Sequence, residues 1–295
     1  LLGTVIEGQS STEAFDVVET IRTNAISYRH GEATTREPIH DELDRLSPDM
    51  QDVVARAFTT YFELVNLAEE RERVREIQEG IQSGELSDTV KEGVEHALDC
   101  SAGAEDPVLI LDHADRLAET TFVLQELIEQ DASNVAVPLI HDPGAVAECR
   151  AAGVGNEVAL DVGSHTSARG GGPVPLSGRV EFVGKKTYTA TGPMKRGERV
   201  TQGETAIVDV DGLWLQLTSR MDGAGLNDTD PINQYGYEAT DFDVIVSKSK
   251  THFRGVFEDL ASQIIIVDAP EYSPADLSRF EYQQAPDDVY PITSE

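Results

Sequence analysis

PVLIL at residues 107–111 is an uninterrupted apolar run, and the polar stretch DHAD at residues 112–115 follows it directly. An apolar run of this length predicts a strand that is buried on both faces, as in a sheet covered by helices on each side. NVAVPLI at residues 134–140 and QIIIVD at residues 263–268 show the same pattern, and residues 242–246 resume it. The C-terminal part of the chain is therefore predicted to be an α/β domain.

Helical periodicity fills the gaps between these runs. Helices are expected at residues 117–128 and 143–152, and a third strand at residues 157–162. This order predicts a βαβαβ unit with a parallel sheet and right-handed crossovers. Residues 180–189 and 205–217 instead alternate apolar and polar positions, and an Asp-Gly pair interrupts the second segment. That pattern predicts an antiparallel layer inserted into the α/β domain.

The N-terminal part of the chain has a different pattern. Ser10 and Glu13 form a capping box that predicts a helix to about residue 29. Ser47-Pro48 supplies a helix start for a long helix to about residue 79. We therefore expect three segments: an all-α helical segment at residues 1–85, a junction helix and linker at 86–106, and the α/β domain at 107–295.

The chain is strongly acidic, with 54 Asp and Glu against 23 Lys and Arg and a formal net charge of −31. A field of this sign repels phosphate, so nucleic acid and anionic membrane are not expected as partners. Lysine supplies only six of the 23 basic residues. This composition is typical of a halophilic protein, in which salt screens the self-repulsion, and the alternative is an ordinary acidic protein.

The cysteine content and the hydropathy pattern suggest a compartment. Cys100 and Cys149 lie in different segments without metal-ligand spacing, which favours a reducing interior. No apolar run approaches the 18 residues that a membrane span needs. We therefore expect a cytoplasmic protein.

Polar residues follow the predicted strands at their carboxyl ends, where open α/β sheets bind ligands. Asp112, His113 and Asp115 follow the first strand and offer two carboxylates and an imidazole, which suits metal ligation or proton transfer. The alternative is a loop in which an Asp caps the next helix and the His faces solvent or a carbonyl group. Asp161 and His165 follow the third strand, where a structural role is likewise the alternative.

A second group of polar residues follows the predicted strand at residues 242–246. Lys248, Lys250, His252 and Arg254 place three cations and a histidine at a strand end and a helix start. Such a group would attract a carboxylate or another anion. The alternative in a protein of this charge is that the cations pair with surrounding acids. Both groups are candidate substrate-binding or anion-binding residues, and no catalytic residue or metal-ligand set is assigned.

The helical segment carries a resemblance to a known family. LLGTVIEGQSSTEAFDVVETIR at residues 1–22 and ARAFTTYFELVNLAEERERVREI at residues 55–77 are similar to the N-terminal helices of phosphoenolpyruvate carboxylase, over residues 1–92. The resemblance implies addition of bicarbonate to phosphoenolpyruvate, with Mg²⁺ as cofactor, to give oxaloacetate. The family's catalytic histidine lies in a TAHPTE-type motif that this sequence does not contain. Carboxylase activity is therefore not expected of this chain.

The remainder resembles a second family. PVLILDHAD, AGVGNEVALDVGSHTS, TAIVDVDGLWLQLTS and VIVSKSKTHFRGVFEDLA occur in order within residues 105–295. They are similar to the C-terminal domain of the microcystinase C (MlrC) family of zinc metallopeptidases. The resemblance implies that the zinc ligands belong to an N-terminal domain, which carboxylase-like helices replace here. Members follow Asp-His-Ala-Asp with Asn and a glycine-rich stretch, whereas RLAET follows Asp115 in this chain.

We therefore expect a fusion or fragment whose larger part is an MlrC-type C-terminal domain. Peptide or amide hydrolysis is the chemistry of the parent family, and little or none is expected without the zinc-bearing domain. A carboxylase fragment and a non-catalytic anion-binding or assembly module are the alternatives. A small peptide or carboxylate is the expected ligand. The apolar stripe with Phe58, Tyr61 and Phe62 on the long helix predicts self-association.

Overall fold

The computed structural model describes residues 12–29, 33–83, 89–113, 115, 118–166, 169–221, 228–249, 252–271, 273 and 280–283, with backbone alone for residues 66–83. The chain divides into two compact units, Leu1–Glu76 and Ile77–Glu295.

The first unit is helical. Its elements are α2 (Thr12–Arg29), α3 (Glu37–Asp44) and most of α4 (Pro48–Ser83). Its small core joins Val17, Val18 and Ile21 of α2 to Val54 and Ala57 of α4. Because these residues recur at helical spacing on both helices, the contact buries one stripe of each.

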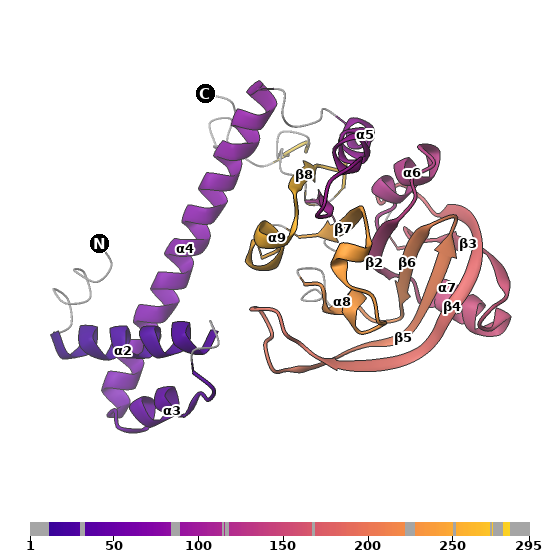
Figure 1. Cartoon of the computed structure of the whole chain (residues 1–295). Helices are drawn as coiled ribbons and strands as arrows, with labels where there is room; N and C mark the ends of the chain where they lie inside the picture. The colour runs from indigo at the N-terminus through magenta and orange to yellow at the C-terminus, as the bar shows by residue number, and fades with distance from the viewer. Residues whose placement is uncertain are drawn as a thin grey trace. The chain divides into compact units, whose positions relative to one another are not determined.

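The second unit is built on one mixed sheet (Figure 1), whose strands run in the order β3-β4-β5-β6-β2-β7-β1-β8. The strands are β1 (Val108–Asp112), β2 (Val135–His141), β3 (Glu157–Val162), β4 (Val174–Thr189), β5 (Arg199–Val210), β6 (Leu213–Thr218), β7 (Val244–Lys248) and β8 (Gln263–Val267). β6, β2, β7, β1 and β8 are parallel neighbours. β3, β4, β5 and β6 pair antiparallel. The expected α/β class with an added antiparallel layer is confirmed.

Helices cover both faces of this sheet. The described helices are α5 (Val90–Ser101), α6 (Phe122–Glu129), α7 (Pro143–Ala152), α8 (Asp230–Asn233) and α9 (Arg254–Leu260), with a 3₁₀ turn, η2 (Ala239–Asp241). Side chains of α5, α6 and α7 share one buried cluster with the strands, and those of α8, η2 and α9 share the other. β1 and β7 are buried at every position because both of their faces are covered.

The third strand differs from the prediction. β3 was expected to continue a parallel βαβαβ unit, but its partner in the described sheet is β4, to which it is antiparallel. Its apolar residues Val158, Leu160 and Val162 alternate with polar or small ones, and three of its six positions are exposed. Alternation of this kind is typical of a half-exposed antiparallel strand, so of the three strands in the predicted βαβαβ unit only β1 and β2 belong to the parallel part of the sheet.

Two other differences are local. The long helix α4 ends at Ser83, a few residues beyond the end predicted near residue 79. β2 has a bulge between Val137 and Ile140, where its register with β6 shifts. Gln216 of β6 accepts a hydrogen bond from the backbone N–H of Leu139 at 3.2 Å, which satisfies a donor in the bulge.

The predicted hairpin is confirmed. Asp211 and Gly212 join β5 to β6 with φ angles of 52° and 92°. Two successive positive φ angles match a type I′ turn, whose twist suits a two-residue hairpin. Among the helices of the described segments, none combines the length and the apolar character that crossing a bilayer requires.

Candidate functional site

A buried ion pair lies at the carboxyl ends of β1 and β7. The parallel register places Asp112 opposite Lys248. Lys248 Nζ lies 2.7 Å from Asp115 Oδ2, and the two side chains are 4% and 0% exposed. Lys248 Nζ also lies 3.5 Å from the carbonyl oxygen of Thr120. The loop after β1 is therefore held against the end of β7 by a charge pair that water does not reach.

The two aspartates are fixed by hydrogen bonds from the same loop. Asp115 accepts from the backbone N–H of Ala118 at 2.8 Å and of Thr120 at 3.2 Å. Asp112 accepts from the Thr120 hydroxyl at 3.1 Å and from the Asp115 N–H at 3.3 Å. These contacts leave both carboxylates oriented by the loop and close to one cation.

The two carboxyl groups have opposite pKa shifts. Burial, followed by the neighbouring charge of Asp115, raises the pKa of Asp112 from 3.8 to about 6. Burial also opposes ionisation of Asp115, but the charge and the hydrogen bond of Lys248 hold the pKa of that carboxyl below its usual value. Near neutral pH the cluster therefore consists of an ionised Asp115–Lys248 pair beside an Asp112 that protonates readily.

The backbone around this cluster is strained. Ala118, Leu139 and Ser164 have φ angles of 56°, 61° and 51°. They come from three segments that touch: the N–H of His141 donates to Ala118 O at 2.7 Å, and the N–H of Ser164 donates to Glu119 O at 2.7 Å. Such conformations cost about 1–3 kcal/mol each and gather at functional sites. The strained backbone therefore supports the carboxyl edge of the sheet as the candidate functional site.

An Asp–His pair lies beside the strained segments. Asp142 follows β2 directly and is 1% exposed. Its Oδ2 lies 3.1 Å from His165 Nε2 and accepts the N–H of Gly163 at 2.9 Å. Only glycine fits at position 163, where φ is +76° and a Cβ atom would lie 2.7 Å from Thr121 Cγ2. Asp142 therefore ties the loop after β3 to the end of β2.

A further contact joins this loop to the loop after β1. Glu119 is 2% exposed, and its carboxylate accepts a hydrogen bond from the Thr166 hydroxyl. The Thr121 hydroxyl donates to the carbonyl oxygens of Gly170 and Gly172 at 3.0 and 2.7 Å. The glycine-rich stretch at residues 170–172 is thus hydrogen-bonded to the start of α6.

The structure brings together only part of the predicted site. Asp112, Asp115 and Lys248 form the buried cluster, and the adjacent His113 is buried at 2% exposure. His113 donates its backbone N–H to Val267 O at 3.0 Å. Its side chain is therefore enclosed at the end of β1 and does not face solvent.

The rest of the cationic group lies elsewhere. His252 and Arg254 are exposed at the start of α9, and Lys250 lies outside the described residues. Arg254 pairs with Glu258 at 2.7 Å, one turn along the helix. Lys248 and Arg254 therefore each pair with an acidic residue, as the alternative interpretation of this cationic group stated.

Sequence reasoning missed Thr120 and Asp142. Asp142 stands directly after an apolar strand, so the rule that singled out Asp112 and Lys248 would also have found it. Thr120 had no such signal, because a threonine shortly before the start of a helix is ordinary. Its role depends on a loop that folds back over β1.

The buried cluster does not fit a zinc ion. A metal bound by Asp115 would have to occupy the position beside its carboxylate where the Lys248 ammonium lies at 2.7 Å. Thr120 and backbone N–H groups donate to the other carboxylate oxygens. Within the described ranges, no group of three or more His, Cys, Asp or Glu could hold a metal ion.

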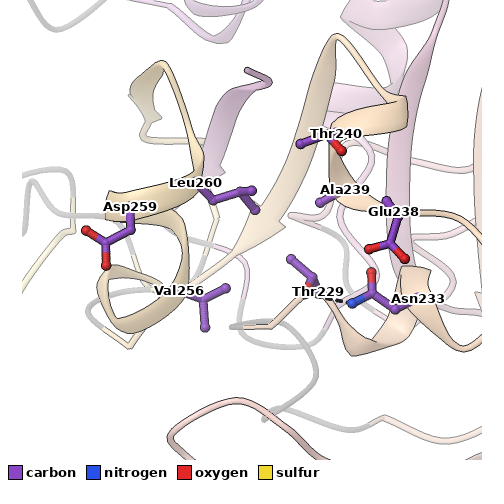
Figure 2. A pocket seen from close by; sticks show the side chains of 8 residues that line it. All are labelled: Thr229, Asn233, Glu238, Ala239, Thr240, Val256, Asp259 and Leu260. Carbon is purple, nitrogen blue, oxygen red and sulfur yellow. Dashed lines mark hydrogen bonds between the residues drawn. The ribbon is translucent and has the colours of Figure 1, made fainter. Parts of the chain in front are cut away.

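A cavity of about 350 Å³ lies on the α8 and α9 side of the sheet (Figure 2). Its wall joins Thr229 and Asn233 to Val256 and Leu260, and Asn233 donates to the Thr229 hydroxyl at 3.1 Å. None of the predicted site residues lines it. The cavity and the carboxyl-edge cluster are therefore separate features of the α/β unit.

Comparison with protein families gives two matches. Residues 117–284 match the family described as MlrC C-terminus. Residues 1–137 match phosphoenolpyruvate carboxylase, so residues 117–137 belong to both matches. The carboxylase match thus extends beyond residue 92, into β1, α6 and the start of β2.

A solved structure shares the α/β fold. A crystal structure from Mesorhizobium sp. BNC1, provisionally named a metallopeptidase, aligns with a TM-score of 0.60 and 23% identity. The alignment covers 68% of this chain and 40% of that chain.

Curated relatives match the N-terminal part. The phosphoenolpyruvate carboxylases of Thermus sp. (strain 71) and Thermus thermophilus are 40% and 43% identical over 75 residues. Each match covers 25% of this chain and 9% of the relative. The carboxylase of Paraburkholderia xenovorans is 36% identical over 112 residues, which is 37% of this chain and 11% of that enzyme. The chain therefore spans about a tenth of the length of these relatives.

Proposed function

Because the chain belongs to the MlrC C-terminus family, we propose that its α/β unit is the substrate-side domain of a metallopeptidase-type hydrolase. In this proposal, zinc belongs to a separate metal-bearing domain of the parent family, whose ligands this chain does not supply. The α/β unit contributes the polar carboxyl edge of its sheet, to which a small peptide or another amide binds. The isolated chain is proposed to hydrolyse peptides slowly or not at all.

The buried Asp115–Lys248 pair is the observation that carries this proposal. It lies where open α/β sheets bind ligands, and it supplies its own cation instead of an open metal position. A lysine ammonium neutralises the carboxylate but cannot lower the pKa of a bound water as Zn²⁺ does. The cluster therefore suits a fixed, charged wall for a substrate more than it suits a water-activating centre.

The experiment is metal analysis together with a hydrolysis assay on the purified chain. We expect zinc well below one equivalent after dialysis against zinc and no release of amines from linear peptides. Stoichiometric zinc with turnover would overturn the proposal. A variant with Lys248→Ala provides a control, because removing the ammonium opens the position beside Asp115. Zinc binding by Lys248→Ala but not by the native chain would support the conclusion that the Lys248 ammonium occupies the position that a metal on Asp115 would need.

The helical unit supports a second candidate. Its matches to phosphoenolpyruvate carboxylases favour a carboxylase-derived scaffold, for which Mg²⁺ would be the cofactor of the complete enzyme. A coupled assay for oxaloacetate from phosphoenolpyruvate and bicarbonate, with Mg²⁺ present, tests this candidate. We expect no product from this chain, and measurable turnover would favour the carboxylase candidate over the hydrolase domain.

The anion-binding module remains a third proposal, with a narrower basis. Lys248 is buried against Asp115, whereas Arg254, although it pairs with Glu258, is exposed, and so is His252. Arg254 and His252 are therefore the described members that an anion could reach. Titration with small carboxylates tests it on the native chain and on Arg254→Ala. Equal weak binding by both proteins would dismiss a site at the start of α9.

A further inference from the structure

The tautomer of His165 follows from its neighbours. His165 Nε2 lies 3.1 Å from Asp142 Oδ2 and 3.1 Å from the carbonyl oxygen of Asp161. Both atoms are acceptors, so Nε2 must carry the ring proton. In the neutral ring, the lone pair is therefore on Nδ1, which makes no recorded hydrogen bond to any described residue.

Asp142 is rigidly oriented for this contact. Its Oδ1 accepts the N–H of Ala145 at 2.9 Å as the N-cap of α7, and its Oδ2 accepts the N–H of Gly163 at 2.9 Å. The Asp142 side chain is 1% exposed, whereas that of His165 is 47% exposed. A fixed, buried carboxylate therefore holds an imidazole that is itself about half exposed.

This arrangement differs from that of a purely structural histidine. Here the loop is already held by Gly163, by the Ser164 N–H to Glu119 O, and by the Thr166 hydroxyl to Glu119. Orientation of His165 by a buried carboxylate is the geometry that fixes a tautomer and stabilises an imidazolium in acid–base catalysis.

We propose that His165 is a proton-accepting residue at the carboxyl edge and that Asp142 is its positioning residue. The ligand class is a group with an acidic O–H or N–H, such as water or a hydroxyl beside a bound amide. This inference rests on the proposed function, since it supplies the acid–base residue for amide hydrolysis in the assembled enzyme. Nothing in it requires a metal ion on this unit.

Every proton in the proposed hydrolysis is accounted for. Nδ1 accepts a proton from a water molecule as the water oxygen forms a bond to the amide carbon. The positive charge on the ring is offset by the Asp142 carboxylate, which stays ionised. When the C–N bond breaks, the imidazolium returns the proton to the leaving amine nitrogen, and the neutral ring is restored.

The first test is the tautomer in the native chain. ¹⁵N–¹H correlation spectra of histidine-labelled protein distinguish a protonated from an unprotonated Nε2. His165→Gln identifies the His165 signals, and it should fold because the side chain is half exposed. We expect the Nε2–H form for His165 at a pH where the ring is neutral. An Nδ1–H form, or an even mixture like that of a free imidazole, would overturn the proposal.

The second test measures intrinsic reactivity with p-nitrophenyl acetate. A poised Nδ1 accepts the acetyl group, p-nitrophenolate leaves, and water then hydrolyses the acetyl-imidazole to acetate. We expect His165→Gln to remove most of the histidine-dependent rate. Asp142→Asn should lower it by about threefold or more, because an amide does not stabilise the cationic ring. His40→Gln is the matched control, since it removes an exposed imidazole for which no carboxylate contact is recorded in the described chain.

The two tests separate this proposal from the proposed function. If His40→Gln lowers the rate as much as His165→Gln does, His165 is an ordinary surface imidazole and the inference is wrong. The tautomer in the native chain decides the matter even if Asp142→Asn fails to fold. Peptide turnover with bound zinc would instead refute the proposed function while leaving the His165 result unchanged.

Discussion

Replacement of Lys248 by Met is expected to destabilise the α/β unit strongly. The Lys248 side chain is 4% exposed and lies 2.7 Å from an Asp115 carboxylate that is fully buried. Met has a similar volume, so the change removes the charge and leaves little cavity. Breaking one side of a buried ion pair costs about 3–5 kcal/mol, because the remaining charge is left buried and uncompensated.

The expected change is large enough to measure in this protein. For a unit of about 200 residues, 3–5 kcal/mol corresponds to a fall in Tm of about 6–20 °C. Trp214 is the single tryptophan of the chain and is 6% exposed on β6, so its fluorescence reports on the α/β unit alone. Urea unfolding followed by this signal gives the free energy of unfolding directly.

Two comparisons isolate the ion pair. Lys185→Met is the matched control, because Lys185 is 67% exposed and lies 3.4 Å from Glu204, and we expect it to cost below about 1 kcal/mol. Asp115→Asn combined with Lys248→Met should cost less than the sum of the single variants. The loss in Lys248→Met should also shrink at pH 5, where the unpaired carboxyl groups protonate. A Lys248→Met protein within about 1 kcal/mol of the native protein at pH 7.5 would refute the reasoning.

The remaining predictions concern pH, backbone strain, salt and association. Because burial raises the pKa of Asp112 to about 6, the folded protein keeps a proton that the unfolded chain releases near its ordinary pKa of 3.8. The stabilisation that this proton provides is thus lost as the pH rises from about 4 to about 6, and the free energy of unfolding falls by about 3 kcal/mol. The free energy of unfolding of Asp112→Asn, measured with urea, should not show this fall with pH. Parallel pH curves for the two proteins would contradict that. Gly163→Ala should cost about 1–3 kcal/mol more than Gly155→Ala, because both glycines have positive φ but only the first would place a Cβ atom against neighbours; equal losses would remove the steric argument. If the charge of −31 is a halophilic adaptation, Tm should rise steadily from 0.1 M to about 2 M KCl, and a flat profile would favour an ordinary acidic protein. The exposed face of α4, where Phe62 is 53% exposed, should produce concentration-dependent sedimentation that Phe62→Glu abolishes, and a monomer at all concentrations would reject it.

Much of the α/β architecture could be predicted from local pattern. The run at residues 107–111 became β1, which is buried at every position because both of its faces are covered. The run at residues 263–268 became β8, but this strand lies at the edge of the sheet and only Ile265 and Val267 of it are buried, so the expectation of burial on both faces was wrong there. The Asp211-Gly212 pair became the turn of the β5–β6 hairpin because few residues adopt two successive positive φ angles.

The placement of β3 shows where the argument from pattern was incomplete. Its position in a strand–helix–strand series favoured a parallel strand, but its alternation of apolar and polar residues matched an exposed antiparallel one. The alternation of apolar and polar residues in a strand depends directly on which of its faces are buried. The succession of strands and helices gives only their order along the chain. The alternation was therefore the better guide.

The sequence by itself determined which segments are buried strands, which turn joins β5 to β6, and which polar residues follow the strand ends. Those properties depend on neighbours within a few residues, so periodicity and turn chemistry suffice to find them. Only the tertiary structure decided that Lys248 pairs with Asp115, that Thr120 folds back onto Asp112, and that Asp142 holds His165. Each of these contacts depends on the order of strands in the sheet and on loops that cross its carboxyl edge. Strand order is set by the packing of the whole unit, and no local pattern records it.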